Sequence, residues 1–234
     1  MKLQKIQSAC SFRSKNNPLK PFVINTKQGR LFVQEASVEE LKNEKFLRKI
    51  VHFFIKNFAS STKDPYWLKF NQFKNRGEMI DSYIDYLRPK IRKDDGNMSL
   101  LMAKDRFGRL CGACWSYGYQ QIPEAVDTTC YIEALAVDDK YRGCHLGDRL
   151  LTKTMDLNKK TFTDVFLKGE MFATGFYRNM GFEIMSEALP NQKDVVKILA
   201  SQGEGYPDYI RFFTKPLQVS KQRWFEVVSD RLKS

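Results

Sequence analysis

The stretch Cys130–Leu151 combines residue types that can bind an anion. It begins with the apolar run Tyr131–Val137, passes through Arg142-Gly-Cys-His-Leu-Gly147 and continues into leucines at helical spacing. This order predicts a strand, a glycine-bearing turn and a helix. The first backbone amides of such a helix have no partner within it, and the helix dipole is positive at that end. We therefore predict a phosphate-binding turn, flanked by the cations Lys140, Arg142 and Arg149.

The elements that must position this turn are a mixture of helices and strands. Ser37 and Glu40 have the spacing of a capping box, which predicts a helix from Ser37 to Phe58. Apolar residues at helical spacing predict further helices at Glu78–Ile91, Leu146–Lys160 and Met171–Met180, the last ending at Gly181. Short β-prone runs predict a hairpin within Pro21–Gln34 and strands at Met98–Ala103, Leu110–Tyr119, Thr128–Val137, Asp164–Lys168, Phe182–Met185 and Tyr209–Thr214.

This pattern predicts a single mixed α/β domain over residues 1–234. Its core would cover about residues 31–215, with a basic N-terminal extension, 1–30, and a helical C-terminal extension, 216–234. The terminal helix either packs on the domain or joins a partner chain, and the second alternative would allow a homodimer. The long insertion Ser186–Asp208 is a candidate flap on the substrate side.

The composition limits the classes of protein to which this chain can belong. No apolar run approaches the roughly 20 residues that cross a bilayer, so we expect a soluble, cytoplasmic protein with no membrane partner. The net charge is +12, and the first 34 residues hold seven Lys or Arg and no acid. This charge is either a solvated basic face or an attraction for a polyanion such as a nucleotide cofactor. The sequence has no recognised nucleic-acid-binding motif, so a nucleic-acid partner is not expected.

Five cysteines, an odd number, favour free thiols in a reducing compartment. Cys111 and Cys114 have the spacing of half a zinc site or of a redox pair. No second cysteine pair accompanies them, the chain has only two histidines, and their segment reads as a strand. We therefore interpret both as small core residues and expect no metal.

Two motifs resemble those of the GNAT superfamily of N-acetyltransferases. Tyr131–Val137 followed by Arg142-Gly-Cys-His-Leu-Gly147 is similar to the family's acetyl-CoA loop, Arg/Gln-x-x-Gly-x-Gly/Ala. Ala173-x-x-x-Tyr177-x-x-x-Gly181-Phe182 matches the family's helix-to-strand motif. The resemblance covers roughly Leu31 to Lys215 and implies an acyl-CoA N-acyltransferase-like fold. Such a fold has a mixed, mostly antiparallel central sheet of about seven strands flanked by helices.

The resemblance also implies a cosubstrate, acetyl-CoA, and its contacts. The pantetheine arm would pair with the backbone of the central strand, at Leu135, Ala136 and Val137, where this strand splays from the next one. The phosphates would bind at the turn and nearby cations, namely Arg142, Gly143, Cys144, His145, Leu146, Gly147, Asp148 and Arg178.

Two residues are candidates for catalysis. The resemblance makes Tyr177 the general acid that protonates the departing thiolate. Glu133 is the only acid within the apolar run Tyr131–Val137 and is the best candidate for general base, acting through water. A carboxylate that only binds the substrate cation is the alternative for Glu133.

The turn departs from the family pattern at one position. His145 stands where the family usually has a glycine, which allows positive φ or close approach to a phosphate. Histidine tolerates positive φ better than most residues, and its ring could donate to a phosphate oxygen. Alternatively the ring crowds the pyrophosphate, and Asp148 competes with phosphate for the positive end of the helix. Arg142, Arg149 and Arg178 could offset both features.

The resemblance therefore predicts direct transfer of an acetyl group to a primary amine in a ternary complex. The alternative is a non-catalytic module of the same fold that binds CoA or another polyanion. The acceptor would be selected by the variable regions Asp64–Gly77, Trp115–Pro123 and Ser186–Asp208. Their aromatic residues suggest an aromatic-walled pocket: Tyr66, Trp67, Trp115, Tyr117 and Tyr119.

Overall fold

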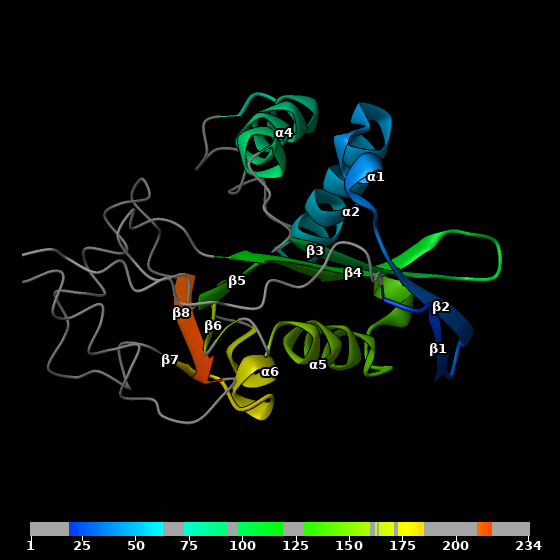
Figure 1. The fold of residues 1–234 in the computed structure, drawn as a ribbon, viewed down its shortest axis with the longest axis vertical. Helices are drawn as coiled ribbons and strands as arrows, with labels where there is room; N and C mark the ends of the chain where they lie inside the picture. The colour runs from blue at the N-terminus through cyan, green and yellow to red at the C-terminus, as the bar shows by residue number, and fades with distance from the viewer. Residues whose placement is uncertain are drawn as a thin grey trace, which may run out of the picture.

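The computed structural model describes residues 19–62, 73–92, 98–118, 129–159, 162, 164–170, 173–184 and 210–216. Within these ranges one sheet contains eight strands in the order β1-β2-β3-β4-β5-β6-β8-β7 (Figure 1). The strands are β1 (Phe22–Thr26), β2 (Gly29–Glu35), β3 (Ser99–Lys104), β4 (Leu110–Gly118), β5 (Thr129–Val137), β6 (Asp164–Glu170), β7 (Glu183–Ile184) and β8 (Ile210–Pro216).

The sheet is mostly antiparallel, as predicted. Every neighbouring pair is antiparallel except β5 and β6, which are parallel. A parallel pair requires a crossover connection, and here α5 (Leu146–Asn158) supplies it. The hairpin strand β1 adds an eighth strand beside β2, so the sheet begins at Phe22. The predicted fold class is therefore confirmed.

Helices cover both faces of the sheet (Figure 1). On one face lie α1 (Val38–Lys42), α2 (Glu44–Thr62) and α4 (Arg76–Arg92), and on the other lie α5 and α6 (Thr174–Asn179). Alternate residues of the strands feed two buried apolar clusters, one on each face. At Gly112 of β4 an added Cβ would lie 2.9 Å from Leu150 Cδ1, so this glycine lets α5 pack directly on the sheet.

The predicted helix Ser37–Phe58 is two helices. The capping box at its start is present, with Ser37 Oγ accepting from the Glu40 amide and Glu40 accepting from the Ser37 amide. Asn43 then adopts an extended conformation, ψ 115°, and its side chain accepts from the Phe46 amide. An asparagine that caps a new helix competes with continuation of the old one, which the apolar periodicity did not reveal.

The other helices and strands predicted within residues 21–215 are found with shifts of a few residues at their ends. The predicted C-terminal helix lies outside the described residues, as do residues 1–18 of the N-terminal extension. Gly181 has φ 79°, and its amide donates to the Arg178 carbonyl, as expected of a glycine that ends a helix. Cys111, Cys114, Cys130 and Cys144 are free and buried, as expected of core thiols. Burial raises the pKa of the Cys114 thiol to about 12. Among the residues described, no helix is both long and apolar enough to span a membrane.

Candidate active site

The two halves of β5 have different neighbours. Thr129–Ile132 pair with Asp164–Leu167 of β6, but β5 continues to Val137. In the described part of the chain, Glu133–Val137 therefore have no strand on this edge. Backbone groups on an unpaired edge remain available to a ligand. This is the splay that the family resemblance implied.

A β-bulge lies at Glu133, where the splay begins. Trp115 of β4 pairs with Ala134, but the next residue, Ser116, pairs with Ile132, so Glu133 is the extra residue. Without the bulge, Glu133 and Ala134 would point to opposite faces of the sheet. Instead Ala134 belongs to the cluster on the α2–α4 face, and the Glu133 carboxylate contacts α4 on that same face. Bulges commonly redirect side chains in this way beside active sites.

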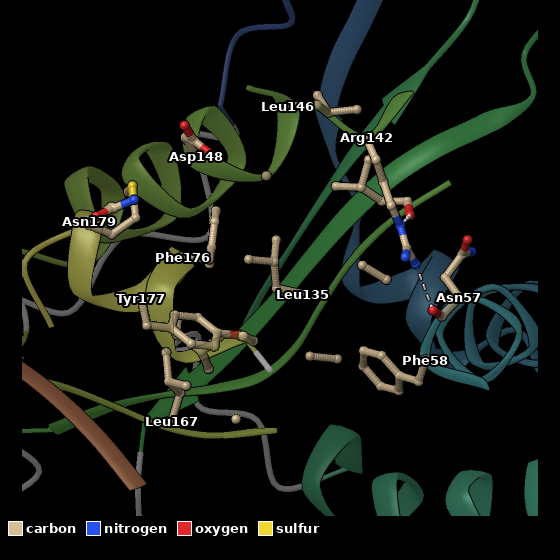
Figure 2. Close-up of a pocket in the computed structure, with 18 of the residues that line it drawn as sticks. Asn57, Phe58, Leu135, Arg142, Leu146, Asp148, Leu167, Phe176, Tyr177 and Asn179 are labelled. Carbon is tan, nitrogen blue, oxygen red and sulfur yellow. Dashed lines mark hydrogen bonds between the residues drawn. The ribbon is translucent and has the colours of Figure 1, made fainter. Parts of the chain in front are cut away.

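A cavity of about 720 Å³ lies along the open half of β5 (Figure 2). Its walls come from the end of α2, from β5, from the turn before α5, and from β6 and α6. Because the sheet is open here, the cavity is lined from both faces: Glu133 lies on the α4 side, and Tyr177 lies in the core on the α5–α6 side. Two substrates can therefore meet at this opening from opposite sides of the sheet.

The turn before α5 contains two residues with left-handed backbone conformation. Gly143 has φ 71°, and His145, the residue before the first turn of α5, has φ 58° and ψ 22°. His145 therefore adopts a positive φ, the conformation that a glycine would allow at this position. The first amides of α5 have no acceptor within the helix and face the cavity end formed by His145, Leu146 and Gly147.

The His145 ring does not cap the helix. It is exposed, and its Nδ1 lies 2.8 Å from Asp148 Oδ2. This contact occupies the carboxylate that would otherwise face an incoming phosphate alone. The two residues that were expected to disfavour phosphate, His145 and Asp148, therefore interact with each other, which the sequence did not show.

Arg142 joins the turn to the opposite wall of the cavity. Its Nη2 donates to the Asn57 carbonyl at 3.0 Å, and its Nε lies 3.0 Å from Asp139 Oδ1 (Figure 2). Asn57 and Phe58, at the end of α2, both line the cavity. Sequence analysis missed these two residues, because only their place at the end of an amphipathic helix marks them.

The predicted cofactor-binding residues Cys144 and Arg178 do not line the cavity, and neither does the flanking cation Arg149. Cys144 is buried, and its Sγ donates to Gln28 Oε1 at 2.6 Å. Arg149 donates to the Asn25 carbonyl at 3.1 Å, and Arg178 is exposed on α6. Cys144 and Arg149 instead hold the turn and α5 against the β1–β2 hairpin. The other predicted cofactor-binding residues all line the cavity: Leu135, Ala136, Val137, Arg142, Gly143, His145, Leu146, Gly147 and Asp148.

Tyr177 points from α6 into the space in front of Leu135 (Figure 2). The residue is 9% exposed, and Phe176 and Phe182 pack edge-on against its ring. The amide of Phe182 donates to the Tyr177 carbonyl at 3.0 Å, which fixes the end of the helix. The ring is therefore held firmly, with its hydroxyl end toward the cavity.

Glu133 accepts hydrogen bonds from tyrosines on two elements. Tyr83 donates to Oε1 and Tyr117 to Oε2, each at 2.6 Å, and Tyr86 Oη lies 3.4 Å from Oε2. Burial and the charge of Glu133 raise the pKa values of Tyr83 and Tyr117. Both phenols therefore stay protonated donors. The lone charge in the apolar strand thus has hydrogen-bond partners, and the two on α4 were not among the candidate site residues.

The predicted aromatic wall is corrected at one residue. Trp115 is fully buried and packs against Phe54, with ring centroids 6.4 Å apart, so it belongs to the core. Tyr117 contacts Glu133 as described above. Tyr66, Trp67 and Tyr119 lie outside the described residues, as do the whole insertion 186–208 and residues 217–234.

The site therefore combines a mixed sheet that opens beside a helix N-terminus with a carboxylate and a tyrosine at the opening. Residues 61–182, slightly more than half of the chain, match the acetyltransferase (GNAT) family. The chain therefore belongs to this family, as its two motifs predicted. The comparison with curated proteins gives no match.

Solved structures share the fold. An acetyltransferase from Streptococcus agalactiae 2603 aligns with a TM-score of 0.51 and 15% identity, covering 80% of this chain and 98% of that one. A GNAT acetyltransferase from Staphylococcus aureus Mu50 gives 0.48 and 17%, over 80% and 99% of the two chains. The PaiA N-acetyltransferase from Thermoplasma acidophilum, solved in complex with coenzyme A, gives 0.48 and 14%, over 80% and 98%.

Proposed function

We propose that this protein is an N-acetyltransferase that moves an acetyl group from acetyl-CoA to a primary amine in a ternary complex. The observation that carries the proposal is the open half of β5. It joins a helix N-terminus at one end to Glu133 at the other, within one cavity that Tyr177 also lines. A thioester cosubstrate with an anionic end needs these features in this order.

The fit of acetyl-CoA follows from the backbone. The left-handed Gly143 and His145 lie just before the free amides of α5, which suits a pyrophosphate group. The pantetheine amides would pair with the unpaired edge at Leu135–Val137 as an added strand does. This arrangement directs the thioester toward Glu133 and Tyr177.

The reaction requires two proton movements. The amine nitrogen attacks the thioester carbonyl carbon, so that a C–N bond forms and the C–S bond breaks. Glu133, directly or through water, accepts a proton from the amine, and the departing thiolate takes a proton from the Tyr177 hydroxyl. The two groups lie on different faces of the sheet, so the acid and the base act on the reaction centre from opposite sides.

We propose that the reaction takes place in a reducing compartment such as the cytoplasm. The free thiols of Cys111, Cys114, Cys130 and Cys144 support this placement, because free buried cysteines are typical of proteins that do not face an oxidising environment.

Thermal unfolding and thiol release together test the proposal. Acetyl-CoA should raise Tm, because a ligand that binds only the folded state stabilises it. Thiol release with a panel of primary amines should then exceed the release without amine, and the product should carry an acetyl group on nitrogen by mass spectrometry. Absence of any Tm shift with acetyl-CoA would contradict the proposal. A Tm shift without amine-dependent release would favour the non-catalytic binding module instead.

A further inference from the structure

A lysine of the protein itself occupies an ammonium site beside Glu133. Lys90 Nζ, on α4, lies 4.2 Å from the ring centroid of Tyr86 and 4.5 Å from that of Tyr117. Cations are attracted to aromatic ring faces within about 6 Å. Nζ also donates to Tyr117 Oη at 2.6 Å, and Tyr117 donates to Glu133 at 2.6 Å. One phenol hydroxyl therefore separates the ammonium from the candidate base.

The geometry around Glu133 is that of a small recognition site. We call Tyr83, Tyr86, Tyr117 and Glu133 the tyrosine site. The rings of Tyr83 and Tyr86 stack with centroids 5.9 Å apart, and Tyr131 packs against Tyr117 at 5.4 Å. Electron-rich ring faces and one carboxylate suit a compact organic cation better than a neutral or anionic group.

The tyrosine site lies at the opening of the sheet. Glu133 and Tyr131 belong both to the surroundings of this site and to the lining of the cavity. The site is on the α4 face, opposite the α5–α6 face that carries Tyr177. A ligand bound here would reach the thioester from the side opposite Tyr177, which is the direction that the attacking amine requires.

The charged form of Lys90 is less stable in this site than it would be in water. Burial lowers the pKa of Lys90, Glu133 opposes that shift, and the charge of Lys168 lowers it further. A partly desolvated ammonium on a flexible four-carbon stem can move out to water at modest cost. A second ammonium can therefore take its place.

We propose that the tyrosine site is the acceptor subsite and that it takes a protonated primary alkylamine with an extended stem, the group that Lys90 supplies in this structure. This inference rests on the proposed function, because it names the acceptor of that reaction. Lys90 is then an internal competitor that leaves when the acceptor enters. Glu133 accepts the ammonium proton of the acceptor and releases it to water before attack, and it then accepts the second proton from the nitrogen as the C–N bond forms.

Binding of cadaverine, followed by isothermal titration calorimetry, tests this assignment without any turnover. The control ligand is 1,5-pentanediol, which has the same length and no charge. The variants are Lys90→Met, which removes the internal ammonium, and Lys90→Arg, which keeps a cation. If Lys90 occupies the site most of the time, its removal should tighten cadaverine binding about tenfold. Lys90→Arg should bind like the wild type, and pentanediol should bind to none.

A second variant tests whether the tighter cadaverine binding arises at the tyrosine site. Tyr86→Leu, made in the Lys90→Met protein, should reverse part of the tightening, by about twofold to fivefold, since one cation–π contact is lost. Acetyl-CoA affinity should stay constant throughout, because neither residue lines the cofactor cavity. Equal cadaverine affinities of Lys90→Met and Lys90→Arg would overturn the assignment, as would equal binding of the diol or no binding of cadaverine to any variant.

Measurements of turnover distinguish a failure of the proposed function from a failure of the acceptor assignment. If no amine gives thiol release, the proposed function fails, whereas the binding pattern still decides whether the tyrosine site takes ammonium. If other amines are acetylated but cadaverine is not, the proposed function stands and the acceptor assignment falls.

Discussion

The two halves of β5 are made of similar residues but have different surroundings. Thr129–Ile132 pair with β6, and Cys130–Ile132 also pair with β4 on the other edge. After the bulge at Glu133, Ala134–Val137 keep the ladder to β4 and, among the described residues, leave the other edge open to the cavity. The first half holds the sheet together, and the second half exposes the same backbone groups to ligands.

The bulge at Glu133 is the boundary between the halves. One extra residue redirects a carboxylate to the α4 face and marks the point from which β5 and β6 diverge. One irregular residue therefore stands where the paired half of β5 ends and its open half begins. Substitutions near the open half should change chemistry, and those near the paired half should change stability.

Tyr177→Phe should give the largest effect and is the strictest test of the open half. Loss of a general acid typically lowers a rate by about 10² to 10⁴. We expect such a fall in kcat for thiol release, while Tm and the shift in Tm caused by acetyl-CoA remain unchanged, because the ring packing is kept. Unchanged kcat would remove Tyr177 as the acid.

Val165→Ala tests the paired half. Val165 is fully buried in β6 and pairs with Cys130 of β5. The substitution removes two buried methyl groups and should lower the free energy of unfolding by about 2 kcal/mol, measured by urea denaturation. The affinity for acetyl-CoA should not change. A large loss of affinity with little loss of stability would contradict the division of β5 into two halves.

Tyr83→Phe tests the boundary at Glu133 through the pH dependence of the free energy of unfolding. The pKa of Tyr83 is raised above 10.0 in the folded protein, so above that pH the unfolded chain ionises while the folded chain does not. The stability from this group is complete below pH 10 and then falls as pH rises, by up to about 1.4 kcal/mol per pH unit. Urea denaturation of the variant should show a shallower loss above pH 10, with parallel curves between pH 7 and 9.

Asp148→Asn should give the smallest effect, at the phosphate end of the open half. Removing a carboxylate from the first turn of α5 should tighten acetyl-CoA binding about twofold to fivefold at low salt and less at high salt. The matched control is Asp156→Asn in the last turns of the same helix, where Asp156 pairs with Lys159 and the affinity should stay constant. Weaker binding of Asp148→Asn would show that the His145–Asp148 pair supports the phosphate site.

The sequence by itself determined the order of the elements and the place of the glycine-bearing turn before α5. Apolar periodicity, the capping box at Ser37 and the glycines at 143 and 181 are local signals, because they depend on neighbours within a few residues. The two motifs around Arg142 and Tyr177 determined the family. These signals also placed Glu133 in the central strand.

Only the tertiary structure decided what surrounds Glu133. Hydrogen bonds from Tyr83 and Tyr117 join residues 50 and 16 positions away, and no local pattern encodes such distances. The same holds for Arg142 reaching Asn57, and for Cys144 and Arg149 turning toward the β1–β2 hairpin instead of the cavity. A bulge is a mismatch between two strands, so it becomes visible only when β4 and β5 are paired. The open edge of β5 likewise exists only because its neighbour β6 diverges from it.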